Sequence, residues 1–401
     1  MKTAIKQTSI LTLSNGFNRF LGMIFLVALT RLIDVSEYGQ FRYLLNIASL
    51  FSLALTGTPI SLAKFLGENP GDRDLRKSVL VNSLSIMSSI YLVIVVIFRI
   101  LYKDYLLLDL LLLGLLIESL YIGFSRGLLN IVKLSVFRLV KNIIQLAAIG
   151  LVALLSLEIG VLEAVLFFLL SNLVSLTALE IYRREMEFSL SFSGAIIKKL
   201  INYTIPVTLG GVGWSVLVTV NPIIIERFRG TESVAYYTAG ITLMQVFAFL
   251  PDAMATMILP KVAGIRDKRN IIKPFLSGVG GSLLINALIL IPVYLFRERI
   301  IIIIFSSEYL NLAPIVLLLA VGQISLVSHQ LFASFWQGLG RPAVPSITIS
   351  VGCAINLVAS IILTNIYGIR GAALSYALST SCSLILIAGY FLLKRKAMVE
   401  V

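Results

Sequence analysis

The 401-residue chain is too apolar for a soluble protein, since 58% of its residues are hydrophobic, only 13% are charged and the mean hydropathy is +0.97. These values exclude an ordinary soluble domain and indicate a chain that resides in a lipid bilayer. The net charge of +13 is explained better by basic loops that face anionic lipid head groups than by nucleic-acid binding, so membrane lipids are the expected partners and nucleic acid is not.

Apolar stretches separated by charged residues predict about twelve membrane-spanning helices. A bilayer core about 30 Å thick is crossed by about 20 helical residues, so a chain of this length can supply that number. In chain order the predicted spans lie near 8–31, 40–66, 79–99, 105–126, 136–157, 160–181, 203–226, 234–260, 274–296, 310–338, 344–366 and 369–393.

Lysine and arginine residues set the predicted orientation of these spans. Cytoplasmic loops of membrane proteins are enriched in both residue types. We therefore predict a multi-pass protein of the cytoplasmic membrane with both termini in the cytoplasm. The even-numbered connections and the two ends of the chain hold most of the basic residues, including Arg73, Arg76, Lys77, Arg183, Arg184, Lys198, Lys199, Arg266, Lys268 and Arg269.

The longest connection divides the predicted spans into two halves. It has paired basic residues around scattered apolar ones, a pattern typical of an interfacial amphipathic segment. A weak internal repeat supports the division, because Lys133, Gly160 and Ala164 recur 208 positions later as Arg341, Gly368 and Ala372. We predict an all-α protein with two six-helix lobes around a central cavity. The predicted parts are an N-terminal lobe at 1–185, an amphipathic cytoplasmic linker at 186–202 and a C-terminal lobe at 203–401.

Arg19 is the first candidate for ligand binding, because a charge inside a span costs at least about 2.5 kcal/mol on insertion scales. Asn15, Asn18 and Arg19 share one helix face with Gly22. A guanidinium group matches phosphate oxygens with two parallel hydrogen bonds, so a pyrophosphate ligand is the favoured partner. The alternative is an ion pair with a carboxylate in another span, for which Glu118 is the candidate.

Three further ionisable residues are candidates for coupling transport to H⁺ or Na⁺. Glu118 lies in the fourth span and Asp252 in the eighth, beside Pro251, which interrupts the backbone. Each carboxylate either binds a coupling ion or pairs with a basic side chain. His329, the only histidine in the chain, is either a proton relay or a packed residue, and packing is favoured.

Glutamine residues form a polar stripe in the tenth span. Gln323 and Gln330 are seven positions apart, and Asn356 lies in the next span. These amide groups are suited to hydrogen bonding with the hydroxyl groups of a saccharide. The alternative is hydrogen bonding between helices, which is nearly as common in membrane proteins.

Motifs for catalysis, nucleotide binding or metal binding are absent from the sequence. It has no phosphate-binding glycine loop with a lysine, no His/Cys metal spacing, and no Ser or Cys nucleophile placed with the single histidine. Cys353 and Cys382 both fall in apolar stretches, which argues against a disulfide or a thiolate metal site. We therefore expect no enzyme activity, no metal site and no cofactor.

Several short motifs resemble those of one family of exporters. The chain resembles the polysaccharide-transporter branch of the multidrug/oligosaccharidyl-lipid/polysaccharide exporter superfamily, which includes the O-antigen and related glycolipid flippases. The resemblance covers nearly the whole chain. The segments that carry it are Ser14 to Gly22, Thr30 to Ile33, Glu37 to Gly39, Ala235 to Tyr237, Leu259 to Lys261, Gln337 to Arg341, Ile355 to Leu357 and Tyr367 to Ala373.

The resemblance implies a function and a set of partners. It implies alternating access that moves an undecaprenyl- or dolichyl-linked saccharide across the membrane, for cell-surface polysaccharide or glycan biosynthesis. Arg19 is similar to the first-helix arginine of the peptidoglycan-precursor flippases, but the further Arg-Asp pair of those relatives is absent here. A glycan polymerase or a glycosyltransferase is the expected protein partner. The alternatives are an ion-coupled multidrug and toxin extrusion antiporter and a non-transporting membrane scaffold of glycan assembly.

Overall fold

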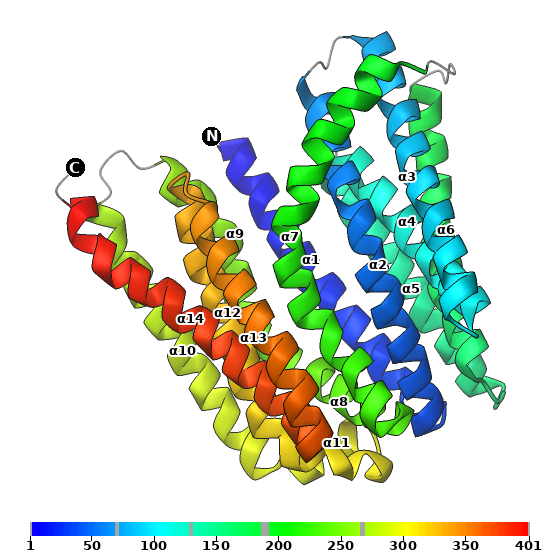
Figure 1. The fold of residues 1–401 in the computed structure, drawn as a ribbon, viewed down its shortest axis with the longest axis vertical. Coiled ribbons are helices and arrows are strands. Elements are labelled where there is room, and N and C mark those ends of the chain that lie inside the picture. The colour runs from blue at the N-terminus through cyan, green and yellow to red at the C-terminus, as the bar shows by residue number, and fades with distance from the viewer. Residues whose placement is uncertain (1, 69–71, 128–130, 186–191, 265–268, 400–401) are drawn as a thin grey trace. The chain divides into compact units, whose positions relative to one another are not determined.

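The computed structural model describes residues 2–68, 72–127, 131–185, 192–264 and 269–399. Within these ranges the chain consists of helices and the turns between them, with no strand (Figure 1). Side chains are described from residue 16 onward, except at some positions near the gaps and a few others. Asn15, which the sequence analysis placed beside Arg19, lies outside the described side chains.

The helices follow the predicted order, and each predicted span coincides with a helix or a run of helices. The long helices are apolar, so every backbone N–H and C=O group inside the bilayer can be paired within its own helix. Helices and 3₁₀ helices (η) are α1 Lys2–Leu29, α2 Val35–Glu68, α3 Arg73–Leu101, α4 Tyr105–Gly127, α5 Ile131–Leu154, α6 Val161–Glu185, α7 Gly194–Arg229, α8 Thr231–Met244, η1 Gln245–Ala248, α9 Phe249–Gly264, α10 Arg269–Leu295, α11 Arg297–Ile304, η2 Ser307–Ile315, α12 Val316–Gly338, α13 Ala343–Tyr367 and α14 Ile369–Val399.

The described helices confirm the prediction of an all-α polytopic membrane protein. Nine helical segments of the described chain are long and apolar enough to cross a membrane, and two shorter apolar stretches lie at 16–29 and 161–173. Large apolar side chains are exposed on the helix surfaces, among them Leu92 (61%) and Leu284 (62%). Lipid tails, unlike water, accommodate such surfaces without a free-energy penalty.

Two predicted spans are interrupted, the eighth and the tenth, and one short helix was not predicted. The tenth span is divided into η2 and α12. The eighth span is divided into α8, η1 and α9, and η1 ends three residues before Pro251. Proline has no N–H group, so the carbonyl of Phe247 loses its helical partner and the chain tightens into a 3₁₀ turn. The short α11 occupies the predicted connection after α10, where Arg297 and Glu298 precede a run of isoleucines.

The chain forms two compact units. The N-terminal unit contains residues 17–215, and the C-terminal unit contains residues 216–401 together with residues 1–16. The division falls inside α1 and inside α7. The lobe boundaries and the central cavity given in the sequence analysis stay predictions.

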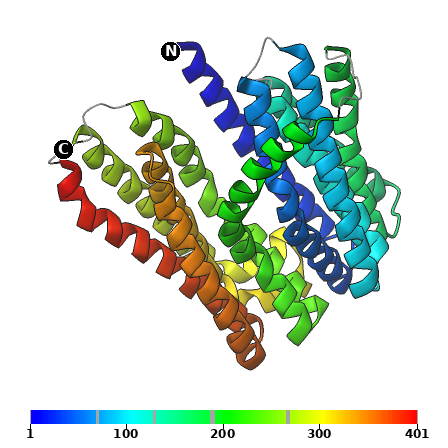
Figure 2. The ribbon, with the colours of Figure 1, turned by 45° about the horizontal axis from the view of Figure 1, so that its top comes forward.

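Each unit has its own hydrophobic core. In the N-terminal unit, helices α2 to α6 form one bundle, seen from two directions in Figures 1 and 2. Its core includes Phe65, Tyr121 and Phe137. The core of the C-terminal unit is an aromatic cluster in which Trp336 and Phe391 are fully buried. Aromatic rings in edge-to-face contact stabilise such cores beyond their buried area.

The internal repeat extends into the packing of the two units. Gly114 of α4 lies against the ring of Phe168 in α6, and Gly322 of α12 lies against the ring of Tyr376 in α14. Both members of the second pair lie 208 positions after those of the first, which is the spacing of the sequence repeat. In the N-terminal unit the glycine in α4 therefore allows close approach of α6, and in the C-terminal unit the glycine in α12 allows close approach of α14.

Side-chain hydrogen bonds in α6 and α14 repeat at the same spacing. Ser171 donates to the carbonyl of Phe168 at 2.8 Å, and Ser379 donates to the carbonyl of Tyr376 at 3.0 Å. The next residues, Asn172 and Thr380, donate to those same carbonyls at 2.8 and 2.7 Å. The two units thus share a packing frame as well as an order of helices.

Candidate functional site

An ion pair inside the membrane is the main polar feature of the N-terminal unit. Lys141 of α5 donates from Nζ to Oε2 of Glu118 in α4 at 2.7 Å. Both residues lie inside apolar segments long enough to span a membrane. The Lys141 side chain is 11% exposed and that of Glu118 is 25% exposed, so the pair is largely removed from water but is not sealed.

Helix packing around the ion pair holds Lys141 in place. Its ammonium group lies 5.2 Å from the centre of the Phe168 ring, a cation–π contact. Phe168 can approach α4 because Gly114 has no side chain, and a Cβ atom there would lie 2.9 Å from the ring. Arg138, one turn before Lys141, also attracts the Glu118 carboxylate. Close packing thus fixes the ammonium group beside the carboxylate, and a second basic residue adds to the positive charge around it.

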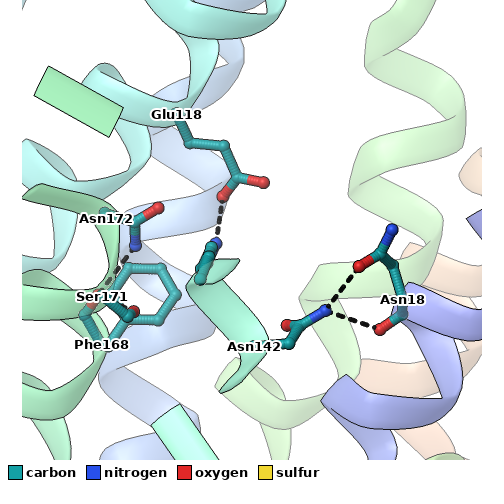
Figure 3. Close-up of polar contacts among 7 residues, drawn as sticks. Asn18, Glu118, Asn142, Phe168, Ser171 and Asn172 are labelled. Carbon is teal, nitrogen blue, oxygen red and sulfur yellow. Dashed lines mark hydrogen bonds and ion pairs between the residues drawn. The ribbon is translucent and has the colours of Figure 1, made fainter. Parts of the chain in front are cut away.

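A second polar contact joins α1 to α5 beside the ion pair. Asn142 donates from Nδ2 to the backbone carbonyl of Asn18 at 2.9 Å and to its Oδ1 at 3.2 Å. Figure 3 shows this contact together with the Glu118 carboxylate. Both asparagines are buried. Because Asn18 and Asn142 immediately adjoin Arg19 and Lys141 in sequence, the contact brings the backbone of these two basic residues close together.

The structure separates the residues that the sequence grouped on the first helix. Asn18 is buried against α5, whereas the side chain of Arg19 is exposed on α1. The carboxylate of Glu118 pairs with Lys141, a partner that the sequence analysis did not consider. The role of Arg19 in ligand binding stays a prediction.

A neutral polar network occupies the C-terminal unit. Asn356 of α13 donates to Oδ1 of Asn221 in α7 at 3.0 Å and to the carbonyl of Leu217 at 3.3 Å. Asn221 in turn donates to the hydroxyl group of Tyr237 in α8 at 2.8 Å. All three polar side chains are at most 2% exposed. The network ties α7, α8 and α13 together without a formal charge.

Gln323 and His329, two further candidates of the C-terminal unit, contact different partners. Gln323 is buried and accepts a hydrogen bond from the hydroxyl group of Tyr376 at 2.9 Å. His329 is 2% exposed, and its Nε2 lies 2.9 Å from Oγ1 of Thr348. Gln330 is half-buried, as is Asp252, which lies in the first turn of α9. Their proposed roles in saccharide binding and ion coupling are not decided by these contacts.

Metal ligation finds no candidate among the described residues. In this part of the chain no three His, Cys, Asp or Glu side chains gather as a metal site would require. Cys353 is buried and Cys382 is half-buried, and both are free thiols.

Sequence reasoning missed Lys141, Asn142 and Asn221 as members of these contacts. The signal for Lys141 was present, since a lysine inside a predicted span is as costly as the arginine and the carboxylates that were selected. The two asparagines could not be distinguished from other polar residues without knowing which helices face each other.

Solved structures with the same fold are membrane transporters. A multidrug resistance transporter of the MATE family, described as inward-facing and as a member of the MOP superfamily, matches with a TM-score of 0.78 at 16% identity, over 98% of this chain and 99% of that one. The lipid II flippase MurJ in an inward closed conformation also matches with a TM-score of 0.78, at 14% identity, over 98% of this chain and 90% of that one.

Relatives in sequence include both whole-length and partial matches. The membrane protein MJ1375 of Methanocaldococcus jannaschii is 24% identical over 98% of both chains. The probable low-salt glycan biosynthesis flippase Agl15 of Haloferax volcanii is 26% identical over 47% of this chain and 40% of its own. The putative O-antigen transporter of Shigella flexneri is 25% identical over 41% of this chain and 39% of its own.

The family follows from a match over more than half of the chain. Residues 4–263 match the model of the polysaccharide biosynthesis protein family. Together with the transporter fold, this match confirms the resemblance noted in the sequence. The chain therefore belongs to the polysaccharide biosynthesis protein family.

Proposed function

We propose that this protein flips a polyprenyl-(pyro)phosphate-linked saccharide across the cytoplasmic membrane by alternating access, for cell-surface polysaccharide or glycan biosynthesis. The observation that carries the proposal is the excess of positive charge inside the spans of the N-terminal unit. Arg19, Arg138 and Lys141 lie in apolar segments with Glu118 as the carboxylate that two of them share. Such an excess favours an anionic ligand.

The proposed mechanism assigns one environment to each part of the ligand. Arg19 holds the pyrophosphate through the two parallel hydrogen bonds that a guanidinium group offers. The prenyl chain stays in lipid, since moving it into a polar environment costs about 0.8 kcal/mol for each CH₂ group. The saccharide crosses among water and polar side chains, and a change between two conformations exchanges the side of access.

Saccharide binding by the predicted amide groups requires an exchange of partners. Gln323 and Asn356 already hydrogen-bond to protein groups and are buried, whereas Gln330 is half-buried. We propose that Gln330 is the first of the three to meet a sugar hydroxyl, and that the other two do so in another conformation. Coupling to H⁺ or Na⁺ through Glu118, Asp252 or His329 remains part of the proposal.

The second candidate function is ion-coupled extrusion of drugs or toxins. It is favoured by the MATE transporter, whose fold matches this chain as well as that of MurJ does. Against it stands the basic character of Arg19 and Lys141, which repels a cationic drug. A membrane scaffold that transports nothing would tolerate neutralisation of Arg19.

Reconstitution into vesicles separates the three functions. Purified protein is incorporated with a fluorescent prenyl-pyrophosphate glycan, and the labelled lipid that changes leaflet is measured against the efflux of a cationic dye. Lipid movement that depends on Arg19 supports the flippase, with protein-free vesicles and an Arg19→Ala variant as controls. Dye efflux without lipid movement would establish the antiporter. If neither lipid movement nor dye efflux is detected, the scaffold function is favoured.

A further inference from the structure

The Lys141–Glu118 pair is present in only one of two units that share a packing frame. In the C-terminal unit, α12 and α13 correspond to α4 and α5 in chain order, and neither contains an Asp, Glu, Lys or Arg residue. At the repeat spacing of 208 positions, Glu118 and Lys141 correspond to Leu326 and Ile349, both buried. Apolar residues at these places thus suffice to build the same helix packing.

An ion pair with only a structural role is therefore an unfavourable way to stabilise this helix packing. Replacing a buried ion pair with apolar residues of similar size is often neutral or stabilising, because the charges no longer have to be removed from water. The C-terminal unit shows that this sequence accommodates such residues at Leu326 and Ile349. The charges of the N-terminal unit call for a reason other than packing.

The geometry of the pair leaves it open to a ligand. Lys141 is held by the Phe168 ring on one side, and among the described residues its polar partner is Glu118. A quarter of the Glu118 side chain is exposed, so the pair is not completely enclosed by protein. Arg138 attracts the same carboxylate, so an anion that displaces Glu118 is attracted by a second basic residue.

We propose that Lys141 binds a phosphate group of the ligand and that Glu118 is an internal anion that occupies Lys141 while no ligand is bound. A phosphate group carries more charge and more acceptor oxygens than a carboxylate, so it satisfies Lys141 and Arg138 together. Glu118 keeps the ammonium group paired in the empty state, which avoids a lone charge inside the membrane. This inference rests on the proposed function and adds a second phosphate-binding residue to Arg19.

Opposite effects of the two neutralising variants test the inference. Binding of undecaprenyl pyrophosphate, without a sugar, is measured on the full chain in phosphatidylcholine nanodiscs. Lys141→Gln should weaken binding about ten- to a hundredfold, the range expected for loss of a hydrogen bond to a charged group. Glu118→Gln should tighten it roughly threefold or more, because a neutral amide competes less well for the ammonium group.

Two control variants match the charge changes on exposed surfaces of the same unit. Lys199→Gln removes an exposed lysine that lies over the Phe65 ring at 4.5 Å. Asp74→Asn removes a carboxylate whose side chain is 95% exposed. Neither should change the affinity more than about twofold, because exposed charges in water interact weakly. Lys141→Arg keeps the positive charge. It should bind the probe with an affinity within a few-fold of that of the native protein, because ammonium and guanidinium groups both bind phosphate but differ in geometry.

A measurement on the native protein keeps the test valid where a variant fails to fold. In solid-state NMR, the ¹⁵Nζ signal of Lys141, assigned by its loss in Lys141→Arg, should be dephased by ³¹P of the bound probe. Absence of dephasing in a probe-saturated sample would overturn the inference. Equal weakening by Lys141→Gln and Glu118→Gln, together with lower melting temperatures, would also overturn it and assign the pair a structural role.

The outcomes also distinguish this inference from the function on which it rests. If the native protein binds the probe and Arg19→Gln weakens binding while Lys141→Gln does not, the inference fails and the proposed function stands. If the native protein neither binds the probe nor moves the labelled lipid, the proposed function fails.

Discussion

We expect Gly322→Ala to destabilise the C-terminal unit by about 1–3 kcal/mol, the range typical of overpacking in a core. A Cβ atom at this position would clash with Cδ1 of Tyr376. It would also lie 2.7 Å from Cε1 of the same ring and 3.3 Å from Cα of Ala377. The ring cannot turn away freely, because its hydroxyl group donates to Gln323 at 2.9 Å. Loss of that bond adds about 1 kcal/mol, which offsets a similar gain in helix propensity.

The corresponding change in the other unit should cost less. At Gly114 a Cβ atom would lie 2.9 Å from Cε1 and 3.2 Å from Cδ1 of Phe168, and a phenylalanine ring has no hydroxyl group to anchor it. We expect Gly114→Ala to destabilise by about 0–2 kcal/mol. Gly280→Ala is the control, since a Cβ atom there has no heavy atom within 4 Å.

Thermal unfolding followed by tryptophan fluorescence measures these differences in detergent or nanodiscs. Trp336 is fully buried in the C-terminal unit and reports its opening. Tyr376→Leu in the Gly322→Ala background should recover part of the loss, with a coupling energy of about 1 kcal/mol or more between two residues in contact. Two results would show that the packing described for the repeat is wrong. One is an equal melting temperature for Gly322→Ala and Gly280→Ala. The other is that the effects of Gly322→Ala and Tyr376→Leu on stability are simply additive.

Three further predictions concern charge, tautomer and orientation. Arg19→Lys should retain part of the lipid movement and Arg19→Ala should abolish it with an unchanged melting temperature, as measured in the vesicle assay. His329 should carry its proton on Nε2, because Thr348 Oγ1 donates its proton to backbone carbonyls of α13 and is left as an acceptor for the ring; ¹⁵N chemical shifts that place the proton on Nδ1 alone would refute this. In a protein without native cysteines, a cysteine at Ser306 should react with an impermeant reagent from outside and one at Ser193 should not; the reverse pattern would invert the predicted orientation.

The helices could be predicted closely because the bilayer leaves the chain few alternatives. Every polar backbone group in lipid must be paired, so each apolar stretch of sufficient length becomes a helix. The departures have local causes. Pro251 divides the eighth span, and the charged pair Arg297–Glu298 allows a separate short helix after α10. The first cause could be read from the sequence, which already placed an interruption at the proline.

The site could be predicted only as a set of costly residues, without their partners. Insertion cost selected Arg19 and Glu118 correctly as unusual, but the partner of Glu118 is Lys141. That choice depends on which faces of α4, α5 and α6 meet, and hence on a small residue such as Gly114 that lets Phe168 approach. Periodicity along one helix carries no information about the rotation of its neighbour.

The two units differ in the chemistry of their buried polar groups where they agree in packing. The N-terminal unit contains charged side chains inside its spans, and in the membrane a charge is tolerated only where a counter-ion is nearby. The C-terminal unit places Asn221, Tyr237 and Asn356 in a neutral network. Amide and hydroxyl groups both donate and accept, as sugar hydroxyls do, so exchanging one for the other changes the number of hydrogen bonds little. Under the proposed function, the neutral groups of the C-terminal unit are therefore suited to select among saccharides.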